Sequence, residues 1–581
     1  MRWIRFLAAI LCAAIAAEAV WWLADRPHPL AAEWNKPLAS VSFAPFRRGE
    51  SPLTGIYATP AQIESDLRAL VGRAYGLRTY TAREGLEIVP DIAEKLGLKV
   101  TFSAWLGRDA GINESEINAL IAAANAHPSA IQRVIVGNEV LLRKDLTPAQ
   151  LIAAIRKVKA AVKQPVSYAD VWAFYLQYPE VGRELDYITI HILPYWEDEP
   201  SPVQDEEAHI MSIVDQIRAT FPGKPILIGE AGWPSMGRDR GPAAVSLVNE
   251  ARFVREMANI AARHGFDYNI VEAFDQPWKA ALENTVGASW GILDEARQPK
   301  FAMTGPVQAV PDWQSRAVVA ILLGAVATIL FGRHLVAFPA MLAFGLSAQF
   351  FSWLLVTTVF HTVAVSFQPW QFYWLPVRIG LPALLFFAAM ARCRDWLQDP
   401  SVALQGAPAA YFGKAPILAR DPWGGQVWMV LGAVYAVAWT LLLLFGGRYR
   451  DIPDFDFALP VGAMLLLPAL RLILALRQGG RARAALAFDG LFPGRRSVAT
   501  QALAWLLPLT AAAACLSESL ALGRGVDFVA MHPRLSDQLP YLLRALVWNR
   551  EMDLWAAMLL VWSVPFIMAR PEPFASRRNR L

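Results

Sequence analysis

Apolar residues are distributed unevenly along the chain, and their pattern divides it into three parts. One apolar run covers about residues 4–23, the stretch from about 36 to 310 is mixed and charged, and long apolar runs recur from Ala317 onward. These later runs have roughly 17–25 residues, the length that a bilayer requires of a spanning helix. The pattern predicts an N-terminal transmembrane helix with a linker (1–32), a globular domain (33–310) and a multi-pass transmembrane domain (311–581).

Short runs rich in β-branched residues and Leu, with turn signals on both sides, recur through the globular part, and amphipathic helical stretches separate most of them. We expect strands over Val41–Phe46, Ala74–Tyr80, Lys99–Trp105, Val134–Glu139, Val166–Val171, Tyr187–His191, Ile226–Glu230 and Tyr268–Phe274. Eight strands that alternate with helices over this length predict a (β/α)8 TIM barrel, whose typical size is about 250 residues. The eighth helix is the weak point, because residues 278–301 indicate mostly loop.

Three helices of this domain are predicted to begin with the same capping signal. A hydroxyl residue, a Pro directly after it and a Gln three residues on occur at Thr59–Gln62, Thr147–Gln150 and Ser201–Gln204. The hydroxyl and the Gln form a capping box, and Pro presets φ at the first helical position. We therefore expect helices to start directly after Thr59, Thr147 and Ser201.

The apolar runs beyond Trp313 predict an all-α transmembrane bundle of about seven helices. We place them near 317–333, 336–358, 371–391, 424–446, 457–476, 500–519 and 553–569. The long apolar block Leu335–Phe367 leaves the count open by one. The N-terminal run is either a cleaved signal peptide or an uncleaved eighth helix, and its length and its closing Trp21 and Trp22 favour the helix.

Arginine clusters predict the orientation of the bundle. If the N-terminus is cytoplasmic, so are the segments 392–426, 477–497 and 570–581, which carry most of these clusters, as the positive-inside rule expects. Four arginines in 522–553 on the other side are an exception. This orientation predicts that the globular domain lies outside the cytoplasmic membrane and that the helices contact membrane lipid.

Composition excludes several classes of function. The three cysteines lie in or beside apolar runs, so no disulfide framework is expected in the globular domain. The net charge of +4 comes without a basic stripe, which argues against nucleic acid as a partner. We expect no metal and no cofactor, because the His, Asp and Glu spacing shows no ligand cluster and no Gly-rich phosphate loop is present.

Two glutamates carry the candidate chemistry. Glu139 and Glu230 each close a predicted strand, at the edge of the barrel where such folds place their active sites. Either one alone could be a surface or salt-bridged carboxylate. Together, on predicted strands four and seven, they suggest the paired acids of a retaining glycosidase, which lie about 5–5.5 Å apart.

Other side chains near the predicted strand ends are candidates for substrate binding. Asn138 could hold a sugar 2-hydroxyl, and Arg78 either positions Glu230 or forms a structural ion pair. Asp275 could bind sugar hydroxyls or cap a helix, and His191 is expected to be a hydrogen-bonded barrel residue. Aromatic residues that could stack on sugar rings, or instead belong to the core or rim, are Trp172, Trp196, Trp233 and Trp278.

Three motifs make residues 38–305 resemble glycoside hydrolase family 17, the β-1,3-glucanase-like family. They are VGNEV at 136–140, GEAGWPS at 229–235 and AFDQPWK at 273–279. The resemblance implies that Glu139 is the acid/base, Glu230 the nucleophile and Tyr195 the tyrosine that hydrogen-bonds near it. The chain departs from the hydrolytic plant members in having Gly229 and Ala231 on either side of the nucleophile, and in its membrane helices.

Membrane-attached bacterial members with this arrangement resemble glucan transglycosylases of the β-(1→6)-glucan synthase type. The resemblance implies remodelling, elongation or β-1,6 branching of β-1,3-glucan in the periplasm. Two alternatives stay open: a membrane-anchored β-1,3-glucanase, and a non-catalytic component that binds or exports glucan. One helix would suffice to anchor the domain, so the additional helices suggest a glucan synthase or export machinery as a partner.

Overall fold

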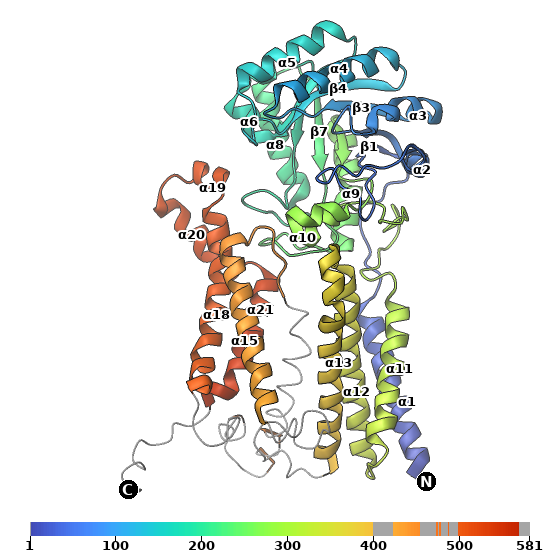
Figure 1. Ribbon diagram of the computed structural model, residues 1–581, viewed down its shortest axis with the longest axis vertical. Helices are drawn as coiled ribbons and strands as arrows, with labels where there is room; N and C mark the ends of the chain where they lie inside the picture. The colour runs from blue at the N-terminus through green and yellow to red at the C-terminus, as the bar shows by residue number, and fades with distance from the viewer. Residues whose placement is uncertain are drawn as a thin grey trace. The chain divides into compact units, whose positions relative to one another are not determined.

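A computed structural model describes residues 2–398, 422–453 and 498–568, with a few isolated positions between the last two segments. The chain forms two compact units. One unit comprises Pro27–Ala309 together with Gly525–Pro533, and the other comprises Met1–Arg26, Val310–Arg524 and Arg534–Leu581. The first unit contains the sheet, and the second consists of helices (Figure 1).

The sheet is a closed barrel of eight parallel strands in sequence order, which confirms the predicted barrel. The strands are β1 (Leu38–Ser42), β2 (Ala74–Arg78), β3 (Lys99–Ala104), β4 (Ile131–Asn138), β5 (Val166–Val171), β6 (Ile188–His191), β7 (Ile226–Ala231) and β8 (Asp267–Ile270). Because β8 ends at Ile270, the predicted last strand was too long, and Asp275 lies in the loop beyond it. The strands are buried almost throughout, as expected of a sheet enclosed by helices.

Helices separate consecutive strands and surround the barrel. They are α2 (Pro60–Leu70), α3 (Val89–Leu96), α4 (Ala110–Ala126), α5 (Pro148–Ala161), α6 (Trp172–Gln177), α7 (Pro179–Glu184), α8 (Glu206–Thr220) and α9 (Leu247–His264). A further short helix, α10 (Ala280–Ala288), corrects the expectation of a loop after β8.

Two of the three predicted capping boxes are present. The side chains of Thr59 and Thr147 accept from the third helical N–H, and the Gln side chains accept from the cap N–H in return. The prediction at Ser201 was wrong, because the chain first forms a 3-10 turn, Val203–Asp205, and α8 begins only at Glu206. The exposed Glu207 in the first turn of this helix suits the positive end of the helix dipole.

Within the described residues, six helices are long and apolar enough to cross a membrane. They are α1 (Arg2–Ala24), α11 (Trp313–Gly332), α12 (Phe338–Ala364), α13 (Pro369–Gln398), the greater part of α18 (Val498–Gly523) and α21 (Arg550–Met568). The predicted helix at 424–446 corresponds to α15 (Pro422–Gly446), of which Ala433–Gly446 forms a shorter apolar helix. The six helices indicate association with a membrane. The predicted helix 457–476 and the arginine-rich segments 477–497 and 570–581 lie almost wholly outside the described residues.

One face of the N-terminal helix α1 packs against α11 and α12 in the helical unit. Phe6 and Ala9 belong to one buried cluster with Ala327 of α11 and Phe344 of α12. Trp21, near the other end of α1, belongs to a second cluster with residues of the same two helices. Removal of α1 would therefore expose apolar faces of α11 and α12.

Candidate active site

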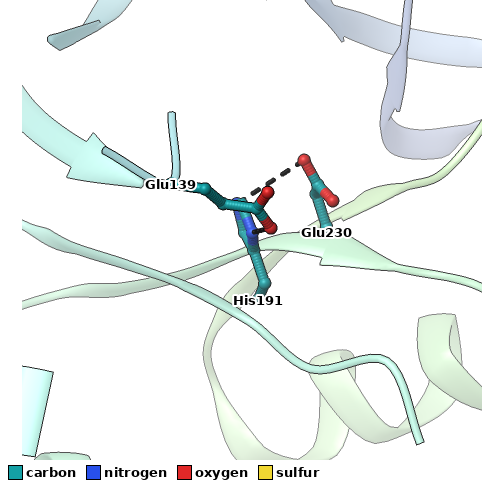
Figure 2. A group of neighbouring side chains, drawn as sticks. All are labelled: Glu139, His191 and Glu230. Atoms are coloured by element: carbon teal, nitrogen blue, oxygen red, sulfur yellow. Dashed lines mark hydrogen bonds and ion pairs between the residues drawn. The ribbon is translucent and has the colours of Figure 1, made fainter. Parts of the chain in front are cut away.

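The two glutamates predicted from the sequence lie together at the carboxyl ends of their strands. Glu139 follows β4 directly, and Glu230 is the second-last residue of β7. One carboxylate oxygen from each, and a ring nitrogen of His191 from β6, all lie within 4.8 Å of one another (Figure 2). This spacing suits a retaining glycosidase, whose carboxyl groups are about 5–5.5 Å apart, better than an inverting one at about 6.5–9.5 Å.

A tight turn places Glu139 at the mouth of the barrel. Gly137 and Glu139 both have positive φ, 88° and 51°. A side chain at 137 would come within 2.8 Å of Cγ2 of Val140, so the turn needs glycine there. A non-glycine residue in the left-handed region is uncommon and tends to occur at functional sites. The backbone N–H of Glu139 donates to the carbonyl of Ala169 (2.8 Å), which fixes the turn against β5.

Arg78 links Glu230 to Asn138, the residue before Glu139. Its guanidinium is fully buried; Nη1 donates to the carbonyl of Gly229 (2.7 Å) and lies 3.4 Å from Oε1 of Glu230, while Nη2 donates to Oδ1 of Asn138. The sequence left open whether Arg78 positions Glu230 or forms a structural ion pair. In the structure its ion pair with Glu230 does both. A Cβ at 229 would overlap the methyl of Thr189 and lie 3.2 Å from Nη1 of Arg78. Glycine before the nucleophile is therefore required mainly by the close approach of Thr189, with Arg78 near the same point.

His191 lies between the acids and is 2% exposed. Its Nδ1 is 3.0 Å from Oε1 of Glu139, and its Nε2 is 3.6 Å from Oε1 of Glu230. Two carboxylates and an imidazole could ligate a metal, a cluster that the sequence did not reveal because the three residues come from three strands. The fit is poor, however, because Nη1 of Arg78 lies 3.4 Å from both Nε2 of His191 and Oε1 of Glu230, and its permanent charge opposes a cation there.

Neighbouring charges give the site its electrostatics. Burial raises the pKa of Glu139, but the hydrogen bond from His191 and the charges of Arg143 and Arg78 outweigh it, so this pKa is lowered. Behind Glu139, burial and the charge of Glu139 raise the pKa of Asp170 to about 6, although a hydrogen bond from Tyr168 opposes the rise.

A second buried acid, Glu272, lies near Glu230, as Asp170 lies near Glu139. Burial, together with the charge of Glu230, raises the pKa of Glu272 to about 7, against the lowering effect of its ion pair with Lys279. Tyr80 also lies close, because its ring stacks on the guanidinium of Arg78 at 4.7 Å and its hydroxyl contacts Oγ of Ser42 at 2.8 Å. Neither Glu272 nor Tyr80 was predicted as part of the site.

Known proteins resemble the barrel. A family profile described as "BtgE/BtgC glycoside hydrolase domain" matches residues 40–291. A "Glucan 1,3-beta-glucosidase" of Arthroderma benhamiae is 25% identical over 258 residues, which are 42% of this chain and 83% of the relative. A protein of the same name from Schizosaccharomyces pombe is 26% identical over 322 residues, which are 51% and 98% of the two chains. The solved glycoside hydrolase family 17 beta-1,3-glucanosyltransferase from Rhizomucor miehei is 26% identical, with a TM-score of 0.40, over 45% of this chain and 95% of its own.

The barrel is a glycoside hydrolase domain of the family 17 type. This confirms the resemblance that the three motifs suggested and makes the chain an enzyme of this type. The family profile ends at residue 291, so it includes none of the apolar helices from α11 onward.

The aromatic residues around the family 17-type site occupy different environments. Trp172, Trp196 and Trp278 are partly exposed, as sugar platforms must be. Trp233 is only 1% exposed, and its indole N–H donates to the carbonyl of Ala244 (3.0 Å). The prediction that Trp233 stacks on sugar was therefore wrong, because its ring turns into the core. Tyr195 is fully buried, and its hydroxyl donates to the carbonyl of Arg238 (2.7 Å), so its predicted place near the nucleophile stays a prediction.

Asp275 is held by structural contacts. Its Oδ1 accepts from Nζ of Lys300 (2.9 Å) and from the N–H of Gly291 (2.9 Å). Lys300 also pairs with the buried Glu250 at 3.1 Å. These contacts favour a role in fastening the loop after β8 over one in binding sugar.

A further exposed tryptophan near the candidate site was missed. Trp105 directly follows β3 and is 39% exposed. Its backbone N–H donates to Oε2 of the buried Glu116 (3.0 Å), and its ring lies 4.2 Å from the guanidinium carbon of Arg143. Arg143 in turn donates to the carbonyl of Asn138, beside the acid/base candidate. Trp105 was predicted to lie inside the strand Lys99–Trp105, so a search for aromatic residues after strand ends passed over it.

Proposed function

We propose that this chain is a membrane-associated retaining transglycosylase that acts on β-1,3-glucan by double displacement. The observation that carries the proposal is the placement of the carboxylates of Glu139 and Glu230 within 4.8 Å of each other across the barrel mouth. At that separation one acid can attack the anomeric carbon while the other reaches the glycosidic oxygen.

The two acids have distinct roles in this mechanism. Glu230 attacks the anomeric carbon and forms a glycosyl ester, while Glu139 protonates the leaving oxygen. In the second half-reaction Glu139 removes the proton of the incoming hydroxyl, whose oxygen displaces Glu230. Arg78 supports this assignment, because its ion pair with Glu230 at 3.4 Å fixes the nucleophile at the end of β7.

Asn138 is suited to bind the sugar bound to the nucleophile. Its Oδ1 accepts from Arg78, which leaves the Nδ2 donors of the amide to face the substrate. A hydrogen bond from this amide to the sugar 2-hydroxyl would strengthen in the transition state. Arg78 therefore orients two substrate-facing groups at once, Asn138 and Glu230.

The printed names of the fungal relatives, glucan 1,3-beta-glucosidases, support β-1,3-glucan as the substrate. We favour transfer to a sugar over hydrolysis because exposed aromatic surfaces, Trp105 among them, are available to bind an acceptor in competition with water. The same names favour hydrolysis as the second candidate activity. A β-1,6 linkage in the product, with rearrangement of existing glucan, is the finer form of the transfer proposal.

The location is proposed from the apolar helices and the arginine pattern. The helices support a multi-pass membrane protein, and the arginine clusters favour a barrel on the periplasmic side of a bacterial inner membrane. The fungal relatives lend this location no support. A helical unit larger than one anchor suggests contact with a glucan synthase or an export route.

Incubation of the full-length protein in detergent with a linear β-1,3-gluco-oligosaccharide tests the proposal, with mass spectrometry and linkage analysis of the products. Products longer than the substrate, absent with Glu230→Gln, are expected, and their new linkage shows whether the enzyme branches or elongates. Only shorter products would make the chain a membrane-anchored glucanase. Unchanged substrate with intact glucan binding would refute the enzyme mechanism for this substrate and favour the binding or export role.

A further inference from the structure

His191 contacts both catalytic acids from beneath the barrel mouth, a position that no step of the mechanism above requires. Its Nδ1 lies 3.0 Å from Oε1 of Glu139 and its Nε2 lies 3.6 Å from Oε1 of Glu230. Figure 2 shows the ring with its contacts to both acids. The ring is fixed, because His191 is the last residue of β6, pairs with β5 and β7, and is 2% exposed. Because the ring is fixed, it can affect the two acids only through the hydrogen and the lone pair on its two ring nitrogens.

Arg78 decides which ring nitrogen carries the hydrogen. Nη1 of Arg78 is a permanent donor, and it lies 3.4 Å from Nε2 of His191. A second N–H at Nε2 would point toward this donor, so the arrangement favours the lone pair at Nε2 and the hydrogen at Nδ1. The Nδ1–H group then donates to Oε1 of Glu139 at 3.0 Å, a hydrogen bond of good length to a carboxylate.

A donor held against Glu139 favours its carboxylate form. The other charged groups near this carboxylate are Arg143 and Arg78, which also favour the anion, and Asp170, which opposes it. Near Glu230, Glu272 is a second acidic group whose negative charge repels that of its neighbour, as Asp170 does beside Glu139. The balance of these groups suits Glu139 as a base better than as an acid.

The two half-reactions place different demands on this arrangement. In the first, Glu139 must carry a proton and give it to the leaving oxygen. After Glu230 has formed its ester it is uncharged, so Arg78 and His191 then face a single carboxylate, that of Glu139. The Nδ1–H hydrogen bond therefore contributes most to the glycosyl-enzyme, in which Glu139 must be ionised.

We propose that His191 is a positioning residue for the second half-reaction, in which its Nδ1–H holds Glu139 as the base that deprotonates the incoming hydroxyl. In this step the hydroxyl proton passes to Glu139 and the hydroxyl oxygen bonds to the anomeric carbon. The bond from that carbon to Glu230 breaks, and its electron pair returns to the Glu230 carboxylate. The inference rests on the proposed roles of Glu139 and Glu230.

The test uses the full-length protein and a dinitrophenyl β-laminaribioside, whose leaving group departs without protonation. The rapid release of dinitrophenol then reports the first half-reaction, and the steady rate, with a β-1,3-gluco-oligosaccharide as acceptor, reports the second. We expect His191→Leu to keep the burst rate within about threefold and to lower the steady rate by about tenfold or more, as loss of a hydrogen bond to a charged group predicts. His191→Asn, whose amide can still donate to Glu139, should retain most of the steady rate.

The pH dependence gives a readout that general disruption of the site would not move. Without the donor, Glu139 holds its proton to higher pH, so the acidic limb of the steady rate should move upward by about one pH unit or more in His191→Leu. In His191→Asn the limb should stay near that of the wild type. Equal loss of burst and steady rates in His191→Leu, or an unmoved limb, would overturn the inference.

Two controls separate the inference from its premise. Glu139→Ala should retain the burst but lose the steady rate, and azide should restore its turnover by forming a glycosyl azide. If the variant shows neither the retained burst nor the rescue by azide, the proposed role of Glu139 itself fails. If Glu139→Ala behaves as expected and only the His191 variants do not, the fault lies with the inference. If circular dichroism shows that His191→Leu does not fold, His191→Gln replaces it. The longer Gln side chain carries its amide past the Nδ1 position, so the acidic limb should move upward as expected for His191→Leu.

Discussion

Gly229 is the position at which one added methyl group tests the geometry of the site. A Cβ there lies closer than 3.0 Å to Cγ2 of Thr189 and 3.2 Å from Nη1 of Arg78. Neither neighbour is free to move, because both are fully buried and Arg78 is held by the carbonyl of Gly229 and by Asn138. Overpacking of this kind costs about 1–3 kcal/mol. We expect Gly229→Ala to destabilise the barrel by that amount.

The loss is measured as a fall in the midpoint of thermal unfolding of the full chain in detergent, roughly 2–10 °C for a domain of this size. Gly107→Ala is the matched control, because a Cβ at Gly107 meets no heavy atom within 4 Å. The double variant Thr189→Ser/Gly229→Ala removes the clashing methyl and keeps the hydroxyl that donates to Oγ of Ser167 at 2.8 Å. Most of the lost stability should therefore return in the double variant.

Activity should follow the position of the arginine. If the added methyl displaces Arg78 from Glu230, glucan turnover should fall by about tenfold or more, since small misplacements at a reacting centre are costly. An unfolding midpoint equal to that of the wild type would show that the end of β7 yields to the added methyl. A double variant no more stable than Gly229→Ala would show that the methyl of Thr189 is not the reason for glycine at this position.

Three other perturbations address the acceptor surface, a buried acid and the absence of a metal requirement. Trp105→Ala should lower the ratio of transfer to hydrolysis products several-fold, measured by mass spectrometry; an unchanged ratio would remove Trp105 from the acceptor site. Burial raises the pKa of Glu206 from 4.5, so the folded chain keeps a proton that the unfolded chain releases, and stability falls as pH rises above about 4.5. Glu206→Gln should flatten the decline of the unfolding midpoint between about pH 5 and pH 8, and an equal slope in both proteins would contradict this. Dialysis against EDTA should leave turnover intact because Arg78 supplies the positive charge of the site, whereas a loss that zinc restores would refute that account.

The barrel and its two acids could be predicted because each depends on a local pattern. A buried parallel strand is a short run of apolar residues, and its carboxyl end is where the run stops. Glu139 and Glu230 stand at such ends, and the closed order of the strands brings them to one mouth. The capping boxes at Thr59 and Thr147 are local in the same sense. The box at Ser201 failed because a 3-10 turn competes with the helix over the same few residues.

The contacts among the site residues could not be predicted, because they depend on register between strands. Arg78 and His191 reach the acids from β2 and β6, and nothing in either segment specifies which way its side chain leans. The same limit explains the aromatic residues: Trp105 and Trp233 both follow strand ends, but one ring is 39% exposed and the other 1%. The position of a residue along the chain determines at which edge of the barrel it lies. Only packing determines whether its ring points outward or into the core.

The site brings four carboxyl groups together, and their neighbours divide the charge among them. Glu230 is paired with Arg78, and Glu139 accepts its hydrogen bond from His191. Behind them, burial raises the pKa of Asp170 to about 6 and that of Glu272 to about 7. Below these values each of the two outer groups is largely neutral, which limits the repulsion that four carboxylates at close range would otherwise create. The inner pair can then approach within reach of one anomeric carbon, because the guanidinium of Arg78 compensates the charge of Glu230 and His191 donates a hydrogen bond to Glu139.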